Sequence, residues 1–164
     1  MNYPVAVLLS LVLICNTGIA AEFNRSICIN AFKAADYQQA LGQCTGVAEN
    51  GDMDAAFIVA RLYAQGIQGQ PDLSRSVKWL KHAAQLGHAE AAYNLGVAYQ
   101  YGRGAQQDLA KAREAYQQAA DANNPKALRN LAVLYETGIG VEQDLAKAFF
   151  SMRRLLCWDR LIAS

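Results

Sequence analysis

The sequence predicts an all-α protein, a solenoid of helix–loop–helix repeats with a period of 36 residues. Three stretches of that length, 51–86, 87–122 and 123–158, align with one another without a gap. Within each stretch, small and apolar residues recur at steps of three and four, as they do along one face of a helix. A glycine and then an aspartate follow at fixed positions, which is typical of one helix ending and another beginning.

The middle stretch indicates how each unit divides into two helices. Ala91, Leu95 and Tyr99 lie on one face of the first helix. Gly102 is expected to end that helix, because glycine readily takes the left-handed conformation of a helix C-terminus. Asp108 is placed to cap a second helix that begins at the next residue. The same three positions recur as Tyr63, Gly66 and Asp72, as Tyr99, Gly102 and Asp108, and as Tyr135, Gly138 and Asp144.

The segment before the first full unit, residues 22–50, is predicted to be a degenerate first repeat that caps the array. Asp36 lies 36 residues before Asp72, so the capping position of a second helix is retained. A short array needs such a cap, because each two-helix unit buries its apolar face only against a neighbour.

Residues 1–21 are predicted to be a signal peptide. Residues 5–15 are apolar apart from one serine, and small residues follow, so cleavage is expected after Ala20 or Ala21. The apolar run is too short for a membrane-spanning helix, which needs about 20 residues, so no stable membrane insertion is expected after cleavage. The protein is therefore predicted to be exported, either periplasmic or secreted. A lipid anchor at Cys15 and a short uncleaved anchor are the alternatives.

Export determines how the cysteines are interpreted. After removal of the signal peptide, Cys28, Cys44 and Cys157 remain. An oxidising compartment favours one disulfide, and we expect it between Cys28 and Cys44, with Cys157 left as a thiol. The alternative is three small buried hydrophobic side chains with no bond between them.

The end of the chain departs from the repeat. Residues 159–164 are predicted to form a C-terminal tail after the third full unit. The closing sequence, LLCWDRLIAS, is largely apolar and offers no polar capping helix. It either covers the last unit, or is followed by further sequence in relatives, or pairs with another molecule, which would be self-association through this end.

The charge balance excludes one class of partner. The 164 residues contain 15 Lys and Arg against 14 Asp and Glu, a net charge of +1. Such a chain has no basic field to attract nucleic acid or an acidic membrane. We therefore expect no nucleic-acid partner.

No motif for chemistry is found. The glycine pair of GRGAQQD follows a helix rather than a strand and lacks the GK[ST] of a phosphate-binding loop, so a connector between helices is the better interpretation. His82 and His88 have no third metal ligand at a suitable spacing. No serine lies in a nucleophile-elbow context. The sequence therefore predicts no catalytic, metal or cofactor site.

The pattern A-x-x-x-L-[GA]-x-x-Y-x-x-G-x-G-x-x-x-D resembles the Sel-one-like repeat, a relative of the tetratricopeptide repeat. It is carried by Ala91, Leu95, Gly96, Tyr99, Gly102, Gly104 and Asp108, and by Ala127, Leu131, Ala132, Tyr135, Gly138, Gly140 and Asp144. The first full unit departs from it at Val59, which replaces leucine, and at Gly69, which shifts the second glycine. The resemblance implies a right-handed superhelix, scaffolding or adaptor work with a protein or peptide partner, and an exported position in many bacterial members.

In solenoids of this kind, the first helices of the units line the concave face, where a partner binds. If Ala91, Leu95 and Tyr99 face the core, a neighbouring stripe is turned by about 100° from them. This predicted partner-binding stripe comprises Ile58, Arg61, Gln65, Asn94, Val97, Tyr101, Asn130, Val133 and Thr137. Unlike the core positions, these residues differ from unit to unit. Plain solvated helix surface is the alternative interpretation.

Three functions are therefore hypotheses. The first is a non-catalytic exported adaptor that holds a protein or peptide in its concave groove. The second is β-lactam binding or hydrolysis, attributed to a cysteine-rich secreted branch of the family whose units nearly all carry a cysteine pair, whereas units 51–86 and 87–122 have none. The third is a cell-wall or glycan binder, for which tyrosines expected at the surface are the support.

Overall fold

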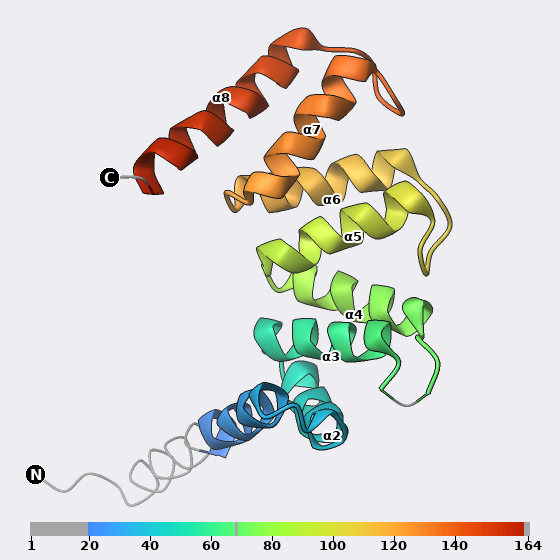
Figure 1. The fold of residues 1–164 in the computed structure, drawn as a ribbon, viewed down its shortest axis with the longest axis vertical. Coiled ribbons are helices and arrows are strands. Elements are labelled where there is room, and N and C mark those ends of the chain that lie inside the picture. Colours follow the sequence, from blue (N-terminus) through green and yellow to red (C-terminus); the bar gives the residue numbers. More distant parts are fainter. Residues whose placement is uncertain (1–19, 68, 163–164) are drawn as a thin grey trace, which may run out of the picture.

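The structure, a computed structural model, describes residues 20–67 and 69–162, with side chains as far as Leu156. Within those residues every regular element is an α-helix, which confirms the all-α prediction. The helices stack in chain order into an α-solenoid whose two ends project to the same side (Figure 1). They are residues 20–33, α2 (Tyr37–Glu49), α3 (Met53–Gln65), α4 (Leu73–Gln85), α5 (Ala89–Tyr101), α6 (Leu109–Asp121), α7 (Pro125–Thr137) and α8 (Leu145–Ile162).

The predicted helix ends are confirmed in the three full units. The first helices α3, α5 and α7 each end at a glycine in the left-handed conformation: Gly66, Gly102 and Gly138. The second helices α4, α6 and α8 each begin one residue after an aspartate whose carboxylate accepts a backbone N–H: Asp72, Asp108 and Asp144. Asp36 caps α2 in the same way, so the first unit keeps the register of the others.

The recurring tyrosine and aspartate hold the loop between the two helices of a unit. In the middle unit, the backbone N–H of Asp108 donates to the Tyr99 carbonyl over 2.9 Å. Lys111 pairs with Asp108 at 2.8 Å and places its ammonium 5.8 Å from the centre of the Tyr99 ring. The hydrogen bonds from Lys111 hold the pKa of Asp108 below its ordinary value. The same arrangement recurs in the other units, with Arg75 over Tyr63 and Lys147 over Tyr135.

The second glycine of the loop contacts the preceding unit. A Cβ on Gly104 would collide with the carbonyl oxygen of Leu73 at the start of α4. A Cβ on Gly140 would collide with the side chain of Leu109, at the start of α6. Gly69, whose position is shifted in the sequence, has no such neighbour. Glycine is therefore required at this position in the second and third full units because the loop lies directly on the unit before it.

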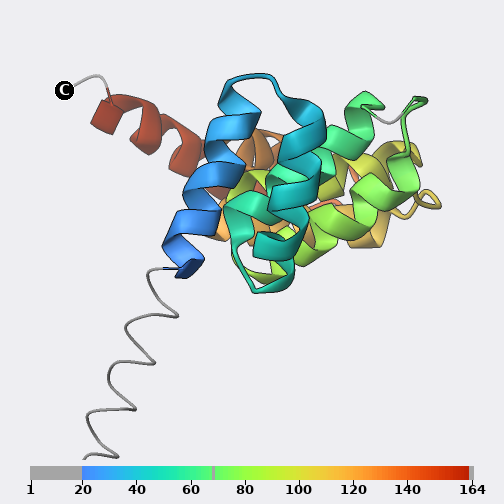
Figure 2. The same ribbon diagram turned by 90° about the horizontal axis from the view of Figure 1, so that it is seen from below.

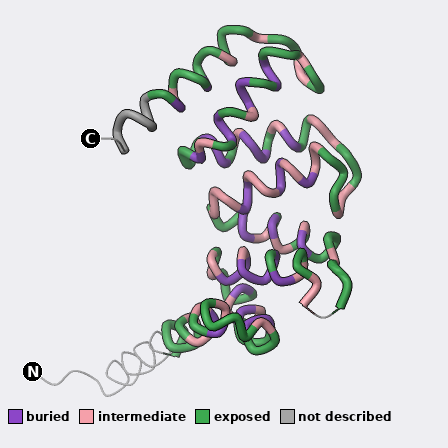
Figure 3. Tube along the Cα trace, in the orientation of Figure 1, coloured by how far each residue is buried: buried purple, intermediate pink, exposed green. Residues whose placement is uncertain are grey.

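Small side chains let the helices of neighbouring units approach closely. Ala55, Ala91 and Ala127 are fully buried at the same place in three units, and Figure 3 shows the buried positions following the inner sides of the helices. Tyr116 is the large exception: it is fully buried and packs on Gly96, where a Cβ would lie 2.5 Å from the ring. Burial raises the pKa of Tyr116 to about 12.

The first unit is a complete helix pair joined by a disulfide. Cys28, in the helix of residues 20–33, bonds to Cys44 on α2, and their Cα atoms are 4.8 Å apart. Both side chains are fully buried, and Figure 2 shows this helix pair in front of the rest of the stack. The predicted disulfide is confirmed. The predicted signal peptide, residues 1–21, lies outside the described residues except for its last two.

The last helix is longer than the second helices of the earlier units. α8 contains 18 residues, whereas α4 and α6 contain 13 each. The helix therefore continues across the predicted boundary at residue 158, and residues 159–162 of the predicted tail belong to α8. The chain turns after Gln85 and Asp121 in the earlier units but remains helical at the equivalent place here.

Candidate functional site

The predicted partner-binding stripe lies on the first helices α3, α5 and α7, and most of it is accessible. Its exposed members are Arg61, Gln65, Tyr101, Val133 and Thr137, and its half-buried members are Asn94, Val97 and Asn130. The inclusion of Ile58 in an accessible stripe is wrong. Ile58 is only 9% exposed, because its apolar side chain packs into the hydrophobic core.

Aromatic and cationic side chains surround the stripe on α3. The guanidinium of Arg61 lies 4.9 Å from the ring centre of Phe32 and 6.0 Å from that of Phe57. The Phe57 ring in turn lies 4.3 Å from the His88 ring of the next unit. Cation–π contacts of this kind hold the exposed Arg61 over a partly apolar surface. This end of the stripe can therefore receive apolar groups and acceptors of hydrogen bonds from arginine.

Cationic side chains also lie beside aromatic rings at the middle of the stripe. Lys126 places its ammonium 5.5 Å from the ring centre of Tyr93, and Arg103 lies 5.4 Å from that of Tyr101. Tyr101 is 60% exposed, although aromatic side chains are usually covered. Exposed aromatic groups beside cations are common anchors of protein interfaces.

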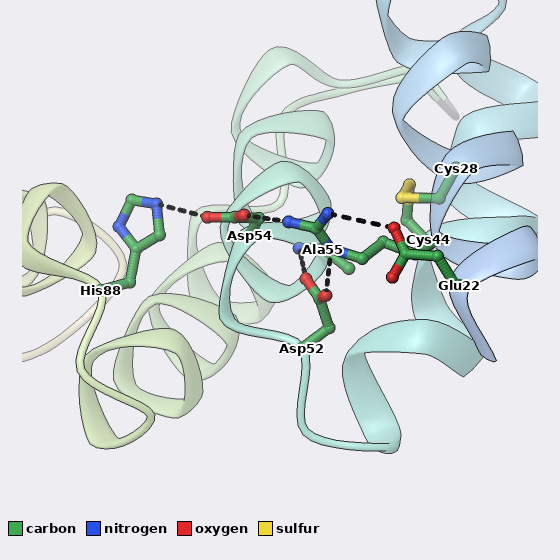
Figure 4. Close-up of polar contacts among 8 residues, drawn as sticks. Glu22, Cys28, Cys44, Asp52, Asp54, Ala55 and His88 are labelled. Carbon is green, nitrogen blue, oxygen red and sulfur yellow. Dashed lines mark hydrogen bonds and ion pairs between the residues drawn. A yellow bond between two sulfur atoms is a disulfide. The ribbon is translucent and has the colours of Figure 1, made fainter. Parts of the chain in front are cut away.

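A row of polar contacts runs along the N-terminal ends of the first helices. Arg25 donates to Asp52 and to Asp54, each at 2.6 Å, and Asp54 lies 3.7 Å from Nε2 of His88 (Figure 4). Asp52 and His88 also cap α3 and α5, because each accepts a backbone N–H at the start of its helix. The row therefore joins the N-terminal helix to two successive units.

Glu90 continues this row on α5. Its carboxylate accepts hydrogen bonds from Asn124, the cap of α7, at 3.0 Å and from Lys126 at 2.8 Å. Burial by itself raises the pKa of Glu90, but the hydrogen bonds from Lys126 and Asn124 outweigh burial and leave the pKa below its ordinary value. Lys126 and Asn124 therefore stabilise the ionised form of Glu90.

Replacing Glu90 is expected to make stability less dependent on acid pH. Glu90→Gln should lower the free energy of unfolding by about 1 kcal/mol at neutral pH, because one charge-assisted contact between units is lost. The folded state lowers the pKa of Glu90, so its contribution is complete above the ordinary glutamate value. That contribution disappears as pH falls through the lowered value, and the two proteins should then converge.

Urea denaturation of both proteins at neutral and acid pH measures this difference. Glu114→Gln is the control, because the Glu114 side chain is 67% exposed, and it should leave stability unchanged. A gap between wild type and Glu90→Gln that is equally large at acid pH would contradict the proposed contact.

A polar side chain at one register position also links the second helix of each full unit to the second helix of the preceding unit. The pairs are His82 with the carbonyl oxygen of Ala48 at 3.1 Å, Gln118 with that of Ala84 at 2.5 Å, and Arg154 with that of Ala120 at 2.8 Å. These carbonyls lie at helix C-termini, where the last turn has no partner within the helix. Sequence reasoning missed these contacts. The available signal was a side chain able to donate a hydrogen bond at the same place in every unit.

Two further observations concern metal binding and membrane spanning. Within residues 20–67 and 69–162, no group of three or more His, Cys, Asp or Glu side chains is placed to hold a metal ion. In the same part of the chain, no helix combines the length and the hydropathy that crossing a bilayer requires. His88, one of the two histidines considered above, instead caps α5.

Comparison with known proteins identifies the repeat. Residues 54–88, 89–124 and 125–150 each match the family model described as Sel1 repeat. A Sel1 repeat protein from Oxalobacter formigenes has a similar structure, with 27% identity over 81% of this chain and a TM-score of 0.73. A protective antigen of uropathogenic Escherichia coli strains that displays an SLR fold is 35% identical over 71% of this chain, with a TM-score of 0.66.

The similarities differ in extent. This chain spans 53% of the Oxalobacter formigenes protein and 25% of the Escherichia coli antigen. Helicobacter pylori cysteine rich protein B is 17% identical over 70% of this chain and 88% of its own length, with a TM-score of 0.59, so that likeness concerns the fold alone. Among curated protein sequences, none matches the chain significantly.

Proposed function

We propose, because this chain belongs to the Sel1 repeat family, that it is an exported, non-catalytic scaffold that holds a protein or peptide against its first helices. The family association supports a protein-interaction repeat scaffold. The accessible positions of the stripe on α3, α5 and α7 are the proposed place of contact.

The observation that carries this proposal is the contrast between two sets of positions on the same helices. One buried alanine of the first helix (Ala55, Ala91 and Ala127) and its tyrosine are identical in the three full units. An accessible position changes instead, as in Gln65, Tyr101 and Thr137, which occupy one register position. A solenoid that repeats its core and varies its accessible face offers a partner a sequence of different contacts.

Export is supported by the Cys28–Cys44 disulfide. Structural disulfides persist in oxidising compartments and are rare in the cytosol of most organisms. We therefore propose a periplasmic or secreted location for the protein.

Replacing Arg61, Asn94 and Tyr101 together with alanine tests the proposed surface. The chain serves as bait for cross-linking and affinity capture from an envelope extract, with captured proteins quantified by mass spectrometry. A protein that uses this surface should be captured at least about tenfold less by the triple variant, since aromatic and arginine side chains dominate most interfaces.

A matched control uses the second helices. Lys78, Gln85 and Glu114 are exposed on α4 and α6, and their joint replacement with alanine should leave capture unchanged. Equal capture by the wild type and the stripe variant would reject the proposed surface. Equal loss in both variants would show that the effect is not specific to it.

A further inference from the structure

The carboxylates at the start of the first helices are already paired with cations. Arg25 pairs with both Asp52 and Asp54, and Lys126 pairs with Glu90 at 2.8 Å. In each case the cation comes from a neighbouring helix pair, so these contacts join units of the solenoid. The charges at this end of the helices therefore act within the fold.

The other end of the first helices carries cations without such partners. Lys33, Arg61 and Arg103 are exposed, and they lie in or just after the last two turns of the helix of residues 20–33, of α3 and of α5. Among the residues that the structure describes, no carboxylate lies within ion-pair distance of these three side chains. The loops that follow α3 and α5 lie on the same edge of the solenoid (Figure 1). These three residues are named the cationic edge.

The exposed acids of the last unit lie away from the cationic edge. Glu136 shares a register position with Gln100, whose side chain accepts a hydrogen bond from Tyr116 on α6 at 2.6 Å. That position therefore faces the second helix of its unit. Glu142 lies in the loop before α8, one unit beyond Arg103. The unpaired positive charge is thus found in the first unit and the first two full units.

Aromatic rings hold both arginines of the cationic edge and leave their N–H groups available. The guanidinium of Arg61 lies 4.9 Å from the ring centre of Phe32, and that of Arg103 lies 5.4 Å from the ring centre of Tyr101. Within the described residues, neither guanidinium donates a hydrogen bond. The N–H donors of a guanidinium form a planar fork that matches the two oxygens of a carboxylate. Both arginines are therefore placed to bind a carboxylate of another molecule.

The groups beside the arginines suit a peptide. Tyr101 is 60% exposed, and the half-buried Val97 on α5 occupies the register position of Arg61 on α3. Apolar and aromatic groups beside cations match a chain that carries both acidic and apolar side chains. A nucleic acid would instead place a phosphate at every nucleotide, including near the carboxylates of Asp52 and Glu90. The face therefore favours an acidic peptide over a nucleic acid.

We propose that the cationic edge binds an acidic peptide segment of the partner, in which carboxylates contact Arg61 and Arg103 and an apolar side chain contacts Tyr101. Lys33 adds positive charge at the N-terminal end of the same edge. This inference rests on the proposed function, since it specifies the kind of partner that the stripe holds.

Selection from a phage-displayed library of random peptides tests the proposal. Peptides about twelve residues long extend to about 40 Å, which is enough to reach across two units. Peptides selected on the wild-type chain should be enriched in Asp and Glu. A copy of a selected peptide with Gln in place of each acidic residue should have a dissociation constant at least about tenfold higher by fluorescence anisotropy. Raising the salt from about 0.05 M to about 0.5 M should weaken only the acidic peptide, because salt screens charges.

Variants of the chain locate the binding. Arg61→Gln/Arg103→Gln should bind the selected peptide at least about tenfold more weakly. Lys81→Gln/Arg153→Gln is the matched control, because it removes the same charge from exposed positions on the second helices, and it should bind as the wild type does. Arg61→Glu should bind a copy of the peptide with Lys in place of its acidic residues better than the wild type does. A variant that had lost its fold could not show this reversal.

Three outcomes would overturn the inference: no selected peptide, selected peptides without acidic residues, or tighter binding of a single-stranded DNA oligonucleotide at the same arginines. Peptides without acidic residues whose binding is lost in Tyr101→Ala would leave the proposed function standing. The proposed function fails separately, if the variant of Arg61, Asn94 and Tyr101 captures partners as the wild type does.

Discussion

Removal of the Cys28–Cys44 disulfide is expected to lower the free energy of unfolding by about 3 kcal/mol. The bond joins residues 16 apart, and closing a loop of that length restricts the unfolded chain by about this amount. It also holds together the first helix pair, which packs on the following unit through α2 and α3. We therefore expect the loss to be concentrated in residues 20–49.

Urea denaturation of the Cys28→Ser/Cys44→Ser double variant, compared with the wild type, measures this loss. Hydrogen exchange should show the helix of residues 20–33 and α2 losing protection first, because a solenoid unit is stabilised by its nearest neighbours. Dithiothreitol should destabilise the wild type and leave the double variant unaffected, which controls for other effects of the reductant. An unchanged unfolding midpoint on reduction would refute the expectation that the bond stabilises the first helix pair.

Gly104→Ala is expected to lower the free energy of unfolding by about 3 kcal/mol, which is the second large effect. Gly104 has φ +77°, a conformation that costs an alanine about 1 kcal/mol or more. The added Cβ would also collide with the carbonyl oxygen of Leu73, and such overpacking costs about 1–3 kcal/mol. The Leu73 backbone belongs to the start of α4 and has little freedom to move.

Gly102→Ala separates these two causes. Gly102 has a similar φ of +66°, but the nearest atom to its Cβ would be 3.5 Å away. Gly102→Ala should therefore lower the free energy of unfolding by about 1 kcal/mol, which is the cost of the backbone conformation alone. Thermal unfolding of both variants gives the comparison. Equal destabilisation would show that the contact between the loop and the preceding unit contributes nothing.

The helices and their ends could be predicted because their signals are local. A capping aspartate bonds to backbone N–H groups three residues away, and a terminal glycine adopts a conformation that depends on its own lack of a side chain. The 36-residue spacing then allowed the helices assigned in one unit to be assigned in all the others, including the degenerate first unit through Asp36. The disulfide was predictable because few cysteines remained to choose from.

The accessible surface was less predictable, and Ile58 shows why. Its place on the helix is the same as that of Asn94 and Asn130, yet it is buried while they are half-buried. Helical geometry specifies the direction of a side chain but not what lies in that direction. The contacts of Arg25 with Asp52 and Asp54 could not be predicted for the same reason, since they join residues 27 and 29 positions apart.

The sequence by itself determined the class of fold, the length of the repeat, the caps and the cysteine pair. Only the tertiary structure decided which face of each helix is covered, which loop glycine contacts the preceding unit, and that α8 continues to Ile162. The physical reason is the range of the interactions. Caps and helix period act within a few residues along the chain, whereas burial depends on the packing of units that the sequence places 36 residues apart.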